Sequence, residues 1–398
     1  MKSILLSITI LAAIATTVDA DWTGFRGSQS NSVSPGDRPP TSWDDQQNIA
    51  WRIDLPGRGP SSPLIVGDRV FVTASSGVNN DRIHVLCYST TSGKQLWERQ
   101  FWATGHAFCH KTTSNAAPTP VSDGKSIYAF FSSNDLVCLD LDGNFKWFRG
   151  LAFDRPKARN DVGMASSPVV ADDVVVAQVE NKGDSFVAGI DTATGETHWL
   201  LERTHDSNWC SPILIGDAKS PLVLLQAGDG LTAVRPATGE VVWHYKTECA
   251  TIPSCVAVGD NLLAPANGIT AVSLRGEETP EFAWNSSRLR PQTNSPVVHK
   301  GRVYVINGAG ILACGSLDGG DTLWQLRLTG PVWSTPVLAG DHLYVLNGKG
   351  LAQVVKIGDK RGQLVATYDF GQPLQATAAV ADNALYVRSD KHLWKIAE

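Results

Sequence analysis

The chain has 398 residues, with 36 glycines, 21 prolines, 13 tryptophans and a formal net charge of −5. Outside the first twenty residues no stretch has the spacing of an amphipathic helix, so the sequence favours an all-β chain with many turns. The negative charge and the lack of a dense Lys/Arg cluster argue against nucleic acid as a partner, because phosphate binding requires a basic stripe.

Residues 1–20 have the pattern of a signal peptide. Lys2 supplies the positive charge, Ile4 to Ala15 form an apolar run, and Val18-Asp19-Ala20 is a small-residue cleavage site. The apolar run is shorter than the ~18 residues that span a bilayer, and no Cys follows the expected cut after Ala20 to carry a lipid anchor. We therefore expect an exported protein, periplasmic or secreted, without a membrane span or lipid anchor.

Residues 21–47 form a polar lead-in that begins Asp21-Trp22-Thr23-Gly24-Phe25-Arg26-Gly27. We expect its Trp22 and Phe25 to pack against the outside of the fold. The segment that follows, Asn48 to Arg52, has the pattern of the last strand of a repeat without the strands that should precede it.

A unit of four short strands joined by turns recurs along residues 48–398 and is clearest between Ser166 and Trp199. Apolar runs alternate with turns rich in Gly, Asp and Asn, which tolerate the positive φ of tight hairpins. Recurrence every ~40 to 50 residues is typical of repeat architectures. The anchor that opens each unit stands at Pro63, Pro118, Pro168, Pro212, Pro253, Pro296 and Pro336, with Ala378 in the last copy.

The last strand of each unit carries a tryptophan, which we expect to pack between neighbouring units because it recurs once per repeat. These residues are Trp51, Trp97, Trp147, Trp199, Trp243, Trp284 and Trp324. Five of them lie four residues after a glycine, namely Gly93, Gly143, Gly195, Gly239 and Gly320. An eighth version, Gly362 to Ala366, has lost its tryptophan.

The order of the strands predicts a closed ring. The final strand of one unit stands alone at the N-terminal side, around Trp51, and the last unit ends at its third strand, Leu393 to Ile396. Closure would complete that unit and would remove exposed sheet edges. We predict an all-β, eight-bladed β-propeller of four-stranded antiparallel blades over residues 48–398, closed by the strand around Trp51.

Seven cysteines are present: Cys87, Cys109, Cys138, Cys210, Cys249, Cys255 and Cys314. Export permits disulfides, but an odd count leaves at least one thiol unpaired. Cys87 and Cys138 occupy the same place in neighbouring repeats and are interpreted as small buried hydrophobes. Cys210 and Cys249 fall in equivalent loops and could pair.

The loops before the anchors should surround the mouth of the central channel, where side chains can converge on a ligand. Three residues before each anchor stand Pro60, Asn115, Ala165, Trp209, Ala250, Thr293 and Trp333. Trp209 and Trp333 depart from the outer-strand pattern, so we expect them to line a funnel and either to bind a ligand or to plug the channel. The candidate contact residues are Asn115, Trp209, Trp333, His110 and Asp161.

His110 and Asp161 come from the two longest such loops, residues 99–117 and 149–165. The first contains His106, Cys109 and His110, which could supply zinc ligands, but a zinc site needs three or four placed donors and no fourth candidate has a known spacing, so we predict no metal site. The basic residues of the second loop are compatible with an anionic ligand and equally with a solvated loop. Neither loop contains a recognisable nucleophile and base pair.

The pattern Asp-x-x-Thr-Gly-x-x-x-Trp of Asp191 to Trp199, with a close variant at Arg235 to Trp243, resembles the repeat of pyrroloquinoline-quinone-like (PQQ-like) propellers. The lead-in resembles the Trp-x-x-Phe-Arg-Gly opening of exported bacterial members of planctomycete type. The resemblance implies either a quinoprotein dehydrogenase, which uses PQQ and Ca²⁺, or a non-catalytic propeller similar to the lipoprotein of the outer-membrane β-barrel assembly machine.

Quinoprotein alcohol dehydrogenases typically carry adjacent cysteines, whereas the closest pair here, Cys249 and Cys255, is six residues apart. The sequence also lacks a Cys-x-x-Cys-His haem site. We therefore expect a non-enzymatic binding or scaffold module without a cofactor, whose partner is an envelope protein or a surface glycan. The alternative is an oxidoreductase that oxidises an alcohol or sugar with PQQ and Ca²⁺ near Trp209 and Trp333.

Overall fold

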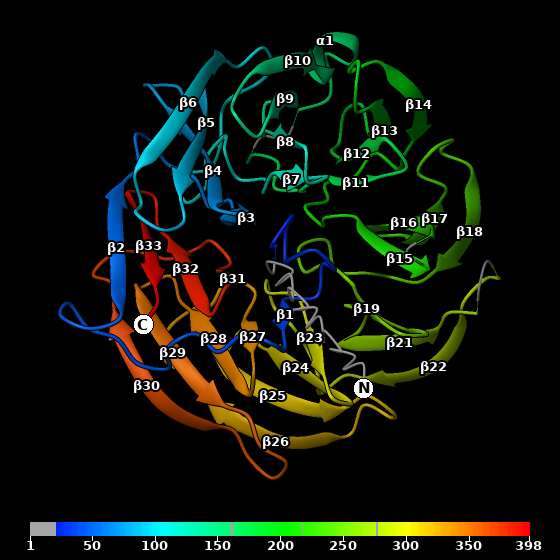
Figure 1. Cartoon of the computed structure of the whole chain (residues 1–398). Coiled ribbons are helices and arrows are strands. Elements are labelled where there is room, and N and C mark those ends of the chain that lie inside the picture. The colour runs from blue at the N-terminus through cyan, green and yellow to red at the C-terminus, as the bar shows by residue number, and fades with distance from the viewer. Residues whose placement is uncertain (1–20, 160–161, 218, 276–277) are drawn as a thin grey trace, which may run out of the picture.

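The computed structural model describes residues 21–159, 162–217, 219–275 and 278–398. The expected signal peptide and Asp161 lie outside the described residues. Eight antiparallel sheets are arranged around one central axis, as Figure 1 shows, and the predicted eight-bladed propeller is confirmed.

The strands of blades 1 to 4 run outward from the axis in chain order. Blade 1 contains β3 (Leu64–Val66), β4 (Arg69–Ser76), β5 (Arg82–Ser89) and β6 (Gln95–Trp102), and blade 2 contains β7 (Val121–Ser122), β8 (Ser126–Phe130), β9 (Asp135–Asp140) and β10 (Phe145–Gly150). Blade 3 contains β11 (Val169–Ala171), β12 (Val174–Val179), β13 (Phe186–Asp191) and β14 (Thr197–Glu202), and blade 4 contains β15 (Ile213–Asp217), β16 (Ser220–Ala227), β17 (Gly230–Val234) and β18 (Val241–Lys246).

Blades 5 to 7 repeat this order. Blade 5 contains β19 (Val256–Val258), β20 (Asn261–Ala264), β21 (Ile269–Ser273) and β22 (Glu281–Ser286), and blade 6 contains β23 (Val297–His299), β24 (Arg302–Ile306), β25 (Ile311–Ser316) and β26 (Thr322–Arg327). Blade 7 contains β27 (Val337–Ala339), β28 (His342–Leu346), β29 (Leu351–Lys356) and β30 (Gln363–Asp369).

Blade 8 is assembled from both ends of the propeller sequence. It contains β31 (Ala379–Ala381), β32 (Ala384–Arg388) and β33 (His392–Ile396), and its outer strand is β2 (Ile49–Asp54). β2 pairs antiparallel with β33, with Trp51 opposite Lys395, and Figure 1 shows the two strands side by side. The predicted closure of the ring is therefore confirmed.

The anchors of blades 2 and 5 differ from the prediction. In the other six blades the innermost strand begins at the residue after the anchor, but β7 follows Pro120 and β19 follows Cys255. The predicted anchors Pro118 and Pro253 lie two residues too early. Pro120 lies in the sequence Pro-Thr-Pro and Cys255 replaces proline, so a rule based on the first proline misplaces both.

The repeated tryptophans join neighbouring blades. The indole Nε1 of Trp147 donates a hydrogen bond of 3.0 Å to the carbonyl of Thr192 in the next blade, and the ring covers Gly195 of that blade. Including this one, the contact occurs six times among the described residues, in the pairs Trp51–Gly93, Trp97–Gly143, Trp147–Gly195, Trp199–Gly239, Trp284–Gly320 and Trp324–Gly362. The tryptophans thus pack between blades, as predicted, and the glycine leaves room for the ring.

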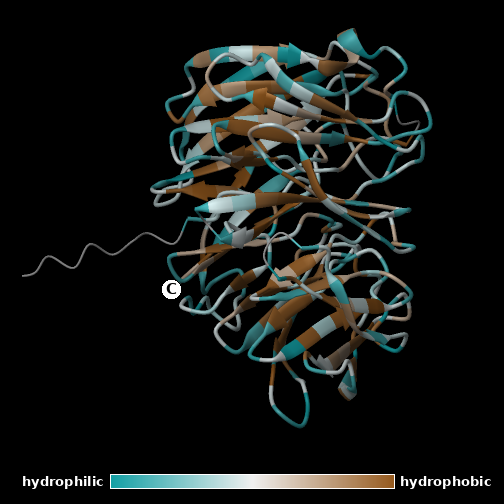
Figure 2. Ribbon diagram, turned by 90° about the vertical axis from the view of Figure 1, so that its right-hand side faces the viewer, coloured by the Kyte–Doolittle hydropathy of each residue, from teal (hydrophilic) through white to brown (hydrophobic). Residues whose placement is uncertain are grey.

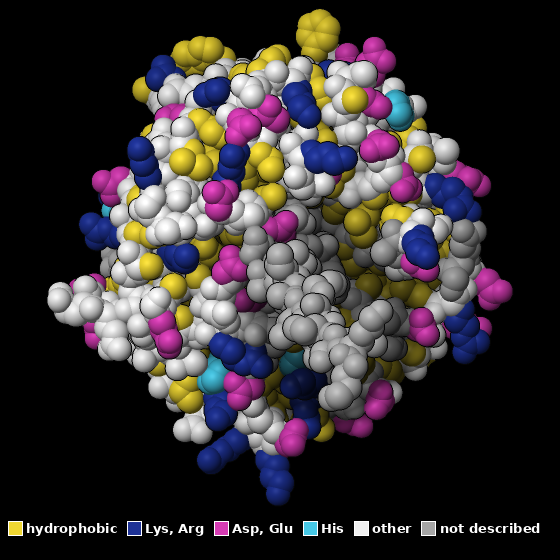
Figure 3. Space-filling model, viewed as in Figure 1, with side chains coloured by type: hydrophobic (Ala, Val, Ile, Leu, Met, Phe, Trp, Pro, Cys, Tyr) yellow, Lys and Arg dark blue, Asp and Glu magenta, His cyan; other side chains and the backbone are white. Residues whose placement is uncertain are grey.

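The hydrophobic core lies between blades. One cluster combines Val85 and Cys87 of blade 1 with Ile127 and Val137 of blade 2. Another cluster fills the junction between blades 3 and 4. Figure 2 shows the apolar residues concentrated in the strands inside the ring and the polar residues in the connecting loops. In Figure 3 cations and anions are interspersed over the visible face.

Helix is nearly absent, in agreement with the sequence. Within the described ranges there is one short helix, α1 (Leu151–Asp154), a single turn in the long loop after β10. Across the part of the chain that the structure describes, no helix has the length and apolar character needed to cross a bilayer.

The lead-in packs at the channel, which corrects the expectation that Trp22 and Phe25 lie against the outside. Trp22 pairs with Ile65 of β3 through two backbone hydrogen bonds of 3.0 Å, and β1 (Val33–Ser34) adds a parallel strand to β27. Between them the guanidinium of Arg26 donates to the carbonyl of Cys255 at 2.7 Å. The innermost strands leave backbone groups unpaired toward the axis, and the lead-in satisfies some of them.

Candidate functional site

A pocket of about 360 Å³ lies on the propeller axis, since residues from all eight blades line it. This volume is within the usual ~300–1,000 Å³ of small-molecule sites. With the corrected anchors, its outer tier consists of the residues three positions before each anchor: Pro60, Ala117, Ala165, Trp209, Ile252, Thr293, Trp333 and Gln375. Phe25 of the lead-in also lines the pocket.

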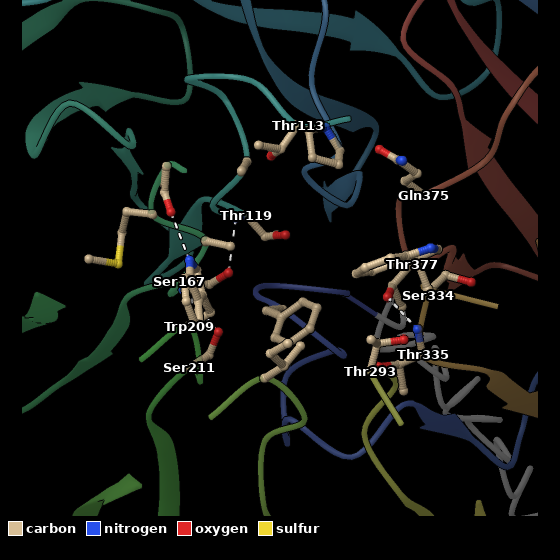
Figure 4. A pocket seen from close by; sticks show the side chains of 18 of the residues that line it. Thr113, Thr119, Ser167, Trp209, Ser211, Thr293, Ser334, Thr335, Gln375 and Thr377 are labelled. Carbon is tan, nitrogen blue, oxygen red and sulfur yellow. Dashed lines mark hydrogen bonds between the residues drawn. The ribbon is translucent and has the colours of Figure 1, made fainter. Parts of the chain in front are cut away.

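A deeper tier of hydroxyl side chains encircles the axis, one position before each anchor. The hydroxyl oxygen of each accepts a hydrogen bond of 2.9–3.1 Å from the backbone N–H of its counterpart in the preceding blade. The accepting residues are Thr119, Ser167, Ser211, Ser254, Ser295, Thr335 and Thr377. Figure 4 labels Thr119, Ser167, Ser211, Thr335 and Thr377 of this set around the pocket. We call this set the hydroxyl ring.

The eighth position of the hydroxyl ring is different. Ser62 of blade 1 is buried, and its hydroxyl has no hydrogen-bond partner within the described ranges. At this junction Arg388 of β32 enters instead, and its Nη1 donates to the carbonyl and the hydroxyl of the neighbouring Ser61. The interruption thus falls where blade 8 meets blade 1, at the closure of the ring.

Three of the predicted contact residues, Trp209, Trp333 and His110, line the axial pocket. Trp209 is half-buried and held in place, because its Nε1 donates to the carbonyl of Gly163 at 2.8 Å. Trp333 has 52% of its surface exposed. The pocket therefore has one fixed and one exposed aromatic wall.

Asn115 does not line this pocket, and Asp161 lies outside the described residues. Asn115 is fully buried; its side-chain oxygen accepts from the N–H of Ser133 at 2.8 Å, and its amide donates to the carbonyl of Asn80 at 3.2 Å. These bonds tie the loop before β7 to the neighbouring hairpins. The corrected anchor explains the difference, because Ala117 takes the position assigned to Asn115.

The His106 to His110 segment does not gather its side chains at one point. Cys109 is buried against the hydroxyl of Ser132, whereas His110 is exposed and its Nδ1 lies 2.8 Å from the hydroxyl of Thr112. His106 is exposed beside Phe108, with ring centroids 6.1 Å apart. Among the residues that the structure describes, no group of three or more His, Cys, Asp and Glu side chains is placed to hold a metal ion.

The lining does not fit a calcium–quinone centre. Ca²⁺ in proteins takes six to eight oxygen ligands that usually include carboxylates, but no described residue that lines the axial pocket is Asp, Glu, Lys or Arg. The nearest pocket with a carboxylate contains Asp390, which is already engaged by Arg58 and by the N–H of Gly59.

All seven cysteines are buried free thiols. Cys210 and Cys249 are not joined, so the pairing that their equivalent loops permit does not form; the Sγ of Cys210 instead faces the carbonyls of Ala250 and Pro253. Burial raises the pKa of the Cys249 thiol to about 12, which disfavours a reactive thiolate.

The sequence missed three kinds of lining residue. Ile252 and Gln375 follow from the repeat once the anchors are placed correctly, and the Ser/Thr position before each anchor is a visible signal in the sequence. Phe25 had no such signal, because its position depends on the path of the lead-in across the channel.

Comparison with known proteins identifies the family. The family model described as outer membrane protein assembly factor BamB matches residues 28–244, 157–277, 220–347 and 311–398. The chain belongs to this family of PQQ-like repeat propellers.

Two BamB proteins are similar to it in sequence. The outer membrane protein assembly factor BamB of Moranella endobia (strain PCIT) is 22% identical over 224 residues, covering 55% of this chain and 52% of that protein. The factor of the same name from Xanthomonas campestris pv. campestris is 26% identical over 185 residues, covering 45% of this chain and 41% of that protein. The matched part of the chain thus spans about half the length of these curated relatives.

Solved structures share the fold at low sequence identity. BamB from Moraxella catarrhalis has a TM-score of 0.64 at 17% identity, with 88% of this chain and 97% of that chain covered. A europium-containing methanol dehydrogenase has a TM-score of 0.72 at 14% identity, with 95% and 98% covered. Since BamB and a dehydrogenase are both similar in fold, the fold by itself does not choose between binding and catalysis.

Proposed function

We propose that this protein is an exported, non-enzymatic propeller of the cell envelope that binds a protein partner at the mouth of its axial pocket. The observation that carries the proposal is the character of this mouth. Trp333 and Ile252, from different blades, are 52% and 42% exposed, and none of the described residues that line the pocket is Asp, Glu, Lys or Arg.

Exposed aromatic side chains at the centre of a concave surface are typical anchors of protein interfaces. The rigid ring supports such a role, because the Trp–Gly contacts and the hydroxyl ring fix the eight loops relative to one another. Membership in the BamB family supports an envelope protein, rather than a surface glycan, as the partner.

Site-specific photo-crosslinking in the source bacterium tests the proposal. A photo-reactive amino acid in place of Trp333 should yield a discrete crosslinked product with an envelope protein. The matched control replaces Phe282, which is 62% exposed on the outer strand β22 and should yield no such product. Equal products at both positions, or none at position 333, would reject the pocket mouth as the partner site.

The quinoprotein alternative has its own test. Purified apoprotein is mixed with PQQ and Ca²⁺ and passed through gel filtration. Quinone absorbance that stays with the protein, together with dye reduction by alcohols or sugars, would overturn the non-enzymatic proposal; on our proposal neither occurs.

A further inference from the structure

A second pocket of about 170 Å³ adjoins the axial pocket at the junction of blades 8 and 1, and the two share Pro60, Thr112 and Gln375. We call it the side pocket. Its lining contains three cationic residues, Arg58, Lys111 and Arg388, and one carboxylate, Asp390. This charge contrasts with the axial pocket, whose described lining contains no Asp, Glu, Lys or Arg.

Arg388 is fully buried, yet only one of its three nitrogen atoms is satisfied. Nη1 donates to Ser61, whereas Nε and Nη2 have no hydrogen-bond partner within the described part of the chain. Gly59 permits the guanidinium to lie this close to the backbone, because a Cβ on that residue would stand 2.6 Å from Nη2 of Arg388. A buried cation with unpaired donors costs free energy unless an acceptor compensates it.

The carboxylate of Asp390 does not fill this role. Its Oδ2 lies 3.0 Å from Nε of Arg58 and its Oδ1 accepts from the N–H of Gly59 at 3.2 Å, so both oxygens are engaged elsewhere. Arg58 in turn donates through Nη2 to the carbonyl of Lys111 at 2.8 Å. Within the described ranges the ammonium group of Lys111 has no hydrogen-bond or ion-pair partner, and this side chain is exposed at the pocket.

We infer that the side pocket binds a carboxylate of a peptide whose apolar part lies in the axial pocket. The ammonium group of Lys111 would bind the carboxylate at the protein surface. The buried guanidinium of Arg388, with its unpaired donors, would attract the carboxylate electrostatically from inside the pocket. A carboxylate, with one negative charge, suits a site in which Asp390 already neutralises part of the cationic charge. The shared residues give the peptide a continuous path from one pocket to the other. The peptide as the source of the carboxylate rests on the proposed function, but the anion site itself does not.

The test compares one short peptide, acetyl-Ala-Ala-Leu, as the free acid and as the C-terminal amide, with binding measured by tryptophan fluorescence and calorimetry. The acid should bind at least about tenfold more tightly than the amide, as charge-assisted hydrogen bonds predict, and this preference should shrink as salt is added. Acetate should compete with the acid more strongly than an equal concentration of phosphate does.

Variants of the lining residues show whether the side pocket causes the preference for the acid. Lys111→Gln should reduce the preference for the acid several-fold, whereas Lys125→Gln, an exposed lysine in the turn between β7 and β8, should leave it unchanged. Arg388→Met should abolish the preference for the acid in a protein whose circular dichroism spectrum matches that of the wild type. If that variant does not fold, the result for Lys111→Gln tests the carboxylate site instead.

Equal affinity for acid and amide, or no saturable binding of either up to about 10 mM, would overturn the carboxylate site. Phosphate that competes better than acetate would overturn the choice of carboxylate. These outcomes leave crosslinking at position 333 unaffected, so failure of the anion site and failure of the proposed function are distinguishable.

Discussion

The indole ring of Trp147 lies over Gly195 of the next blade, so closely that a Cβ on the glycine would stand 2.7 Å from Cδ2 of the ring. Gly195 also has φ of +77°, a conformation that side chains with a Cβ disfavour. One residue therefore meets two requirements, since it shapes the Thr-Gly turn of its own blade and accommodates the tryptophan of the preceding one. This contact links the local turn to the closure of the ring.

Replacing Gly195 by alanine should destabilise the protein by about 2–5 kcal/mol, because the left-handed backbone and the overpacked indole each add to the cost. The comparison is Gly36→Ala, where a Cβ meets no atom within 4 Å and the change should stay within about 0.5 kcal/mol. Urea denaturation followed by tryptophan fluorescence measures both. Equal midpoints for the two variants would contradict the proposed importance of the contact.

The hydroxyl ring predicts a contrast between two serines. Ser211→Ala removes the acceptor of the buried N–H of Ser167, a bond of 2.9 Å, and should cost about 1–3 kcal/mol. Ser62→Ala removes a hydroxyl without a partner among the described residues and should change stability by less than about 0.5 kcal/mol. Thermal melts of both variants check this; a larger loss for Ser62→Ala would mean that an unseen partner engages its hydroxyl.

The Asp-x-x-Thr-Gly turn predicts a dependence on pH. The hydroxyl and backbone N–H of Thr194 hydrogen-bond to Asp191 at 2.8 and 2.6 Å, and these bonds, aided by the N–H of Ala193 and by His198, lower the pKa of the Asp191 carboxyl below 3.8. A carboxyl whose pKa is lower in the folded state stabilises the fold above its unfolded pKa, and this stabilisation is lost as the pH falls through the folded value.

The free energy of unfolding of the wild type should therefore exceed that of Asp191→Asn by about 0.5–1.5 kcal/mol at pH 7. This difference in stability should narrow below about pH 3.8. Urea midpoints of the two proteins at several pH values measure it. A difference that stays constant down to pH 2.5 would show that the charge of Asp191 contributes nothing to the turn.

Closure of the ring predicts the effect of a deletion. Without residues 48–55, blade 8 loses β2 and exposes the backbone edge of β33, which pairs with β2 from Ile49 to Asp54. An exposed sheet edge promotes association with other chains. Gel filtration should show aggregates, and a soluble monomer with an unchanged melting temperature would contradict the role of β2.

The sequence alone determined the architecture, because the signals that specify it are local. Alternating apolar residues, Gly- and Asp-containing turns and a recurring tryptophan act over a few residues and repeat around the ring, so the number of blades and the closure by the strand around Trp51 could be predicted. Trp209 and Trp333 could be placed at the channel for the same reason, since their distance from a correctly identified anchor fixes their position in the blade.

The remaining features depended on contacts between residues far apart in the chain. The Pro-Thr-Pro sequence at residues 118–120 does not reveal which proline precedes the inner strand; the hydrogen bond between Thr119 and Ser167 of the next blade decides it. Phe25 reaches the axial pocket only because the lead-in crosses the ring. The side pocket is lined by cations from different blades, namely Arg58, Lys111 and Arg388. No spacing in the sequence therefore predicts this pocket. Only closure of the ring, which brings blade 8 against blade 1, places these three cations together.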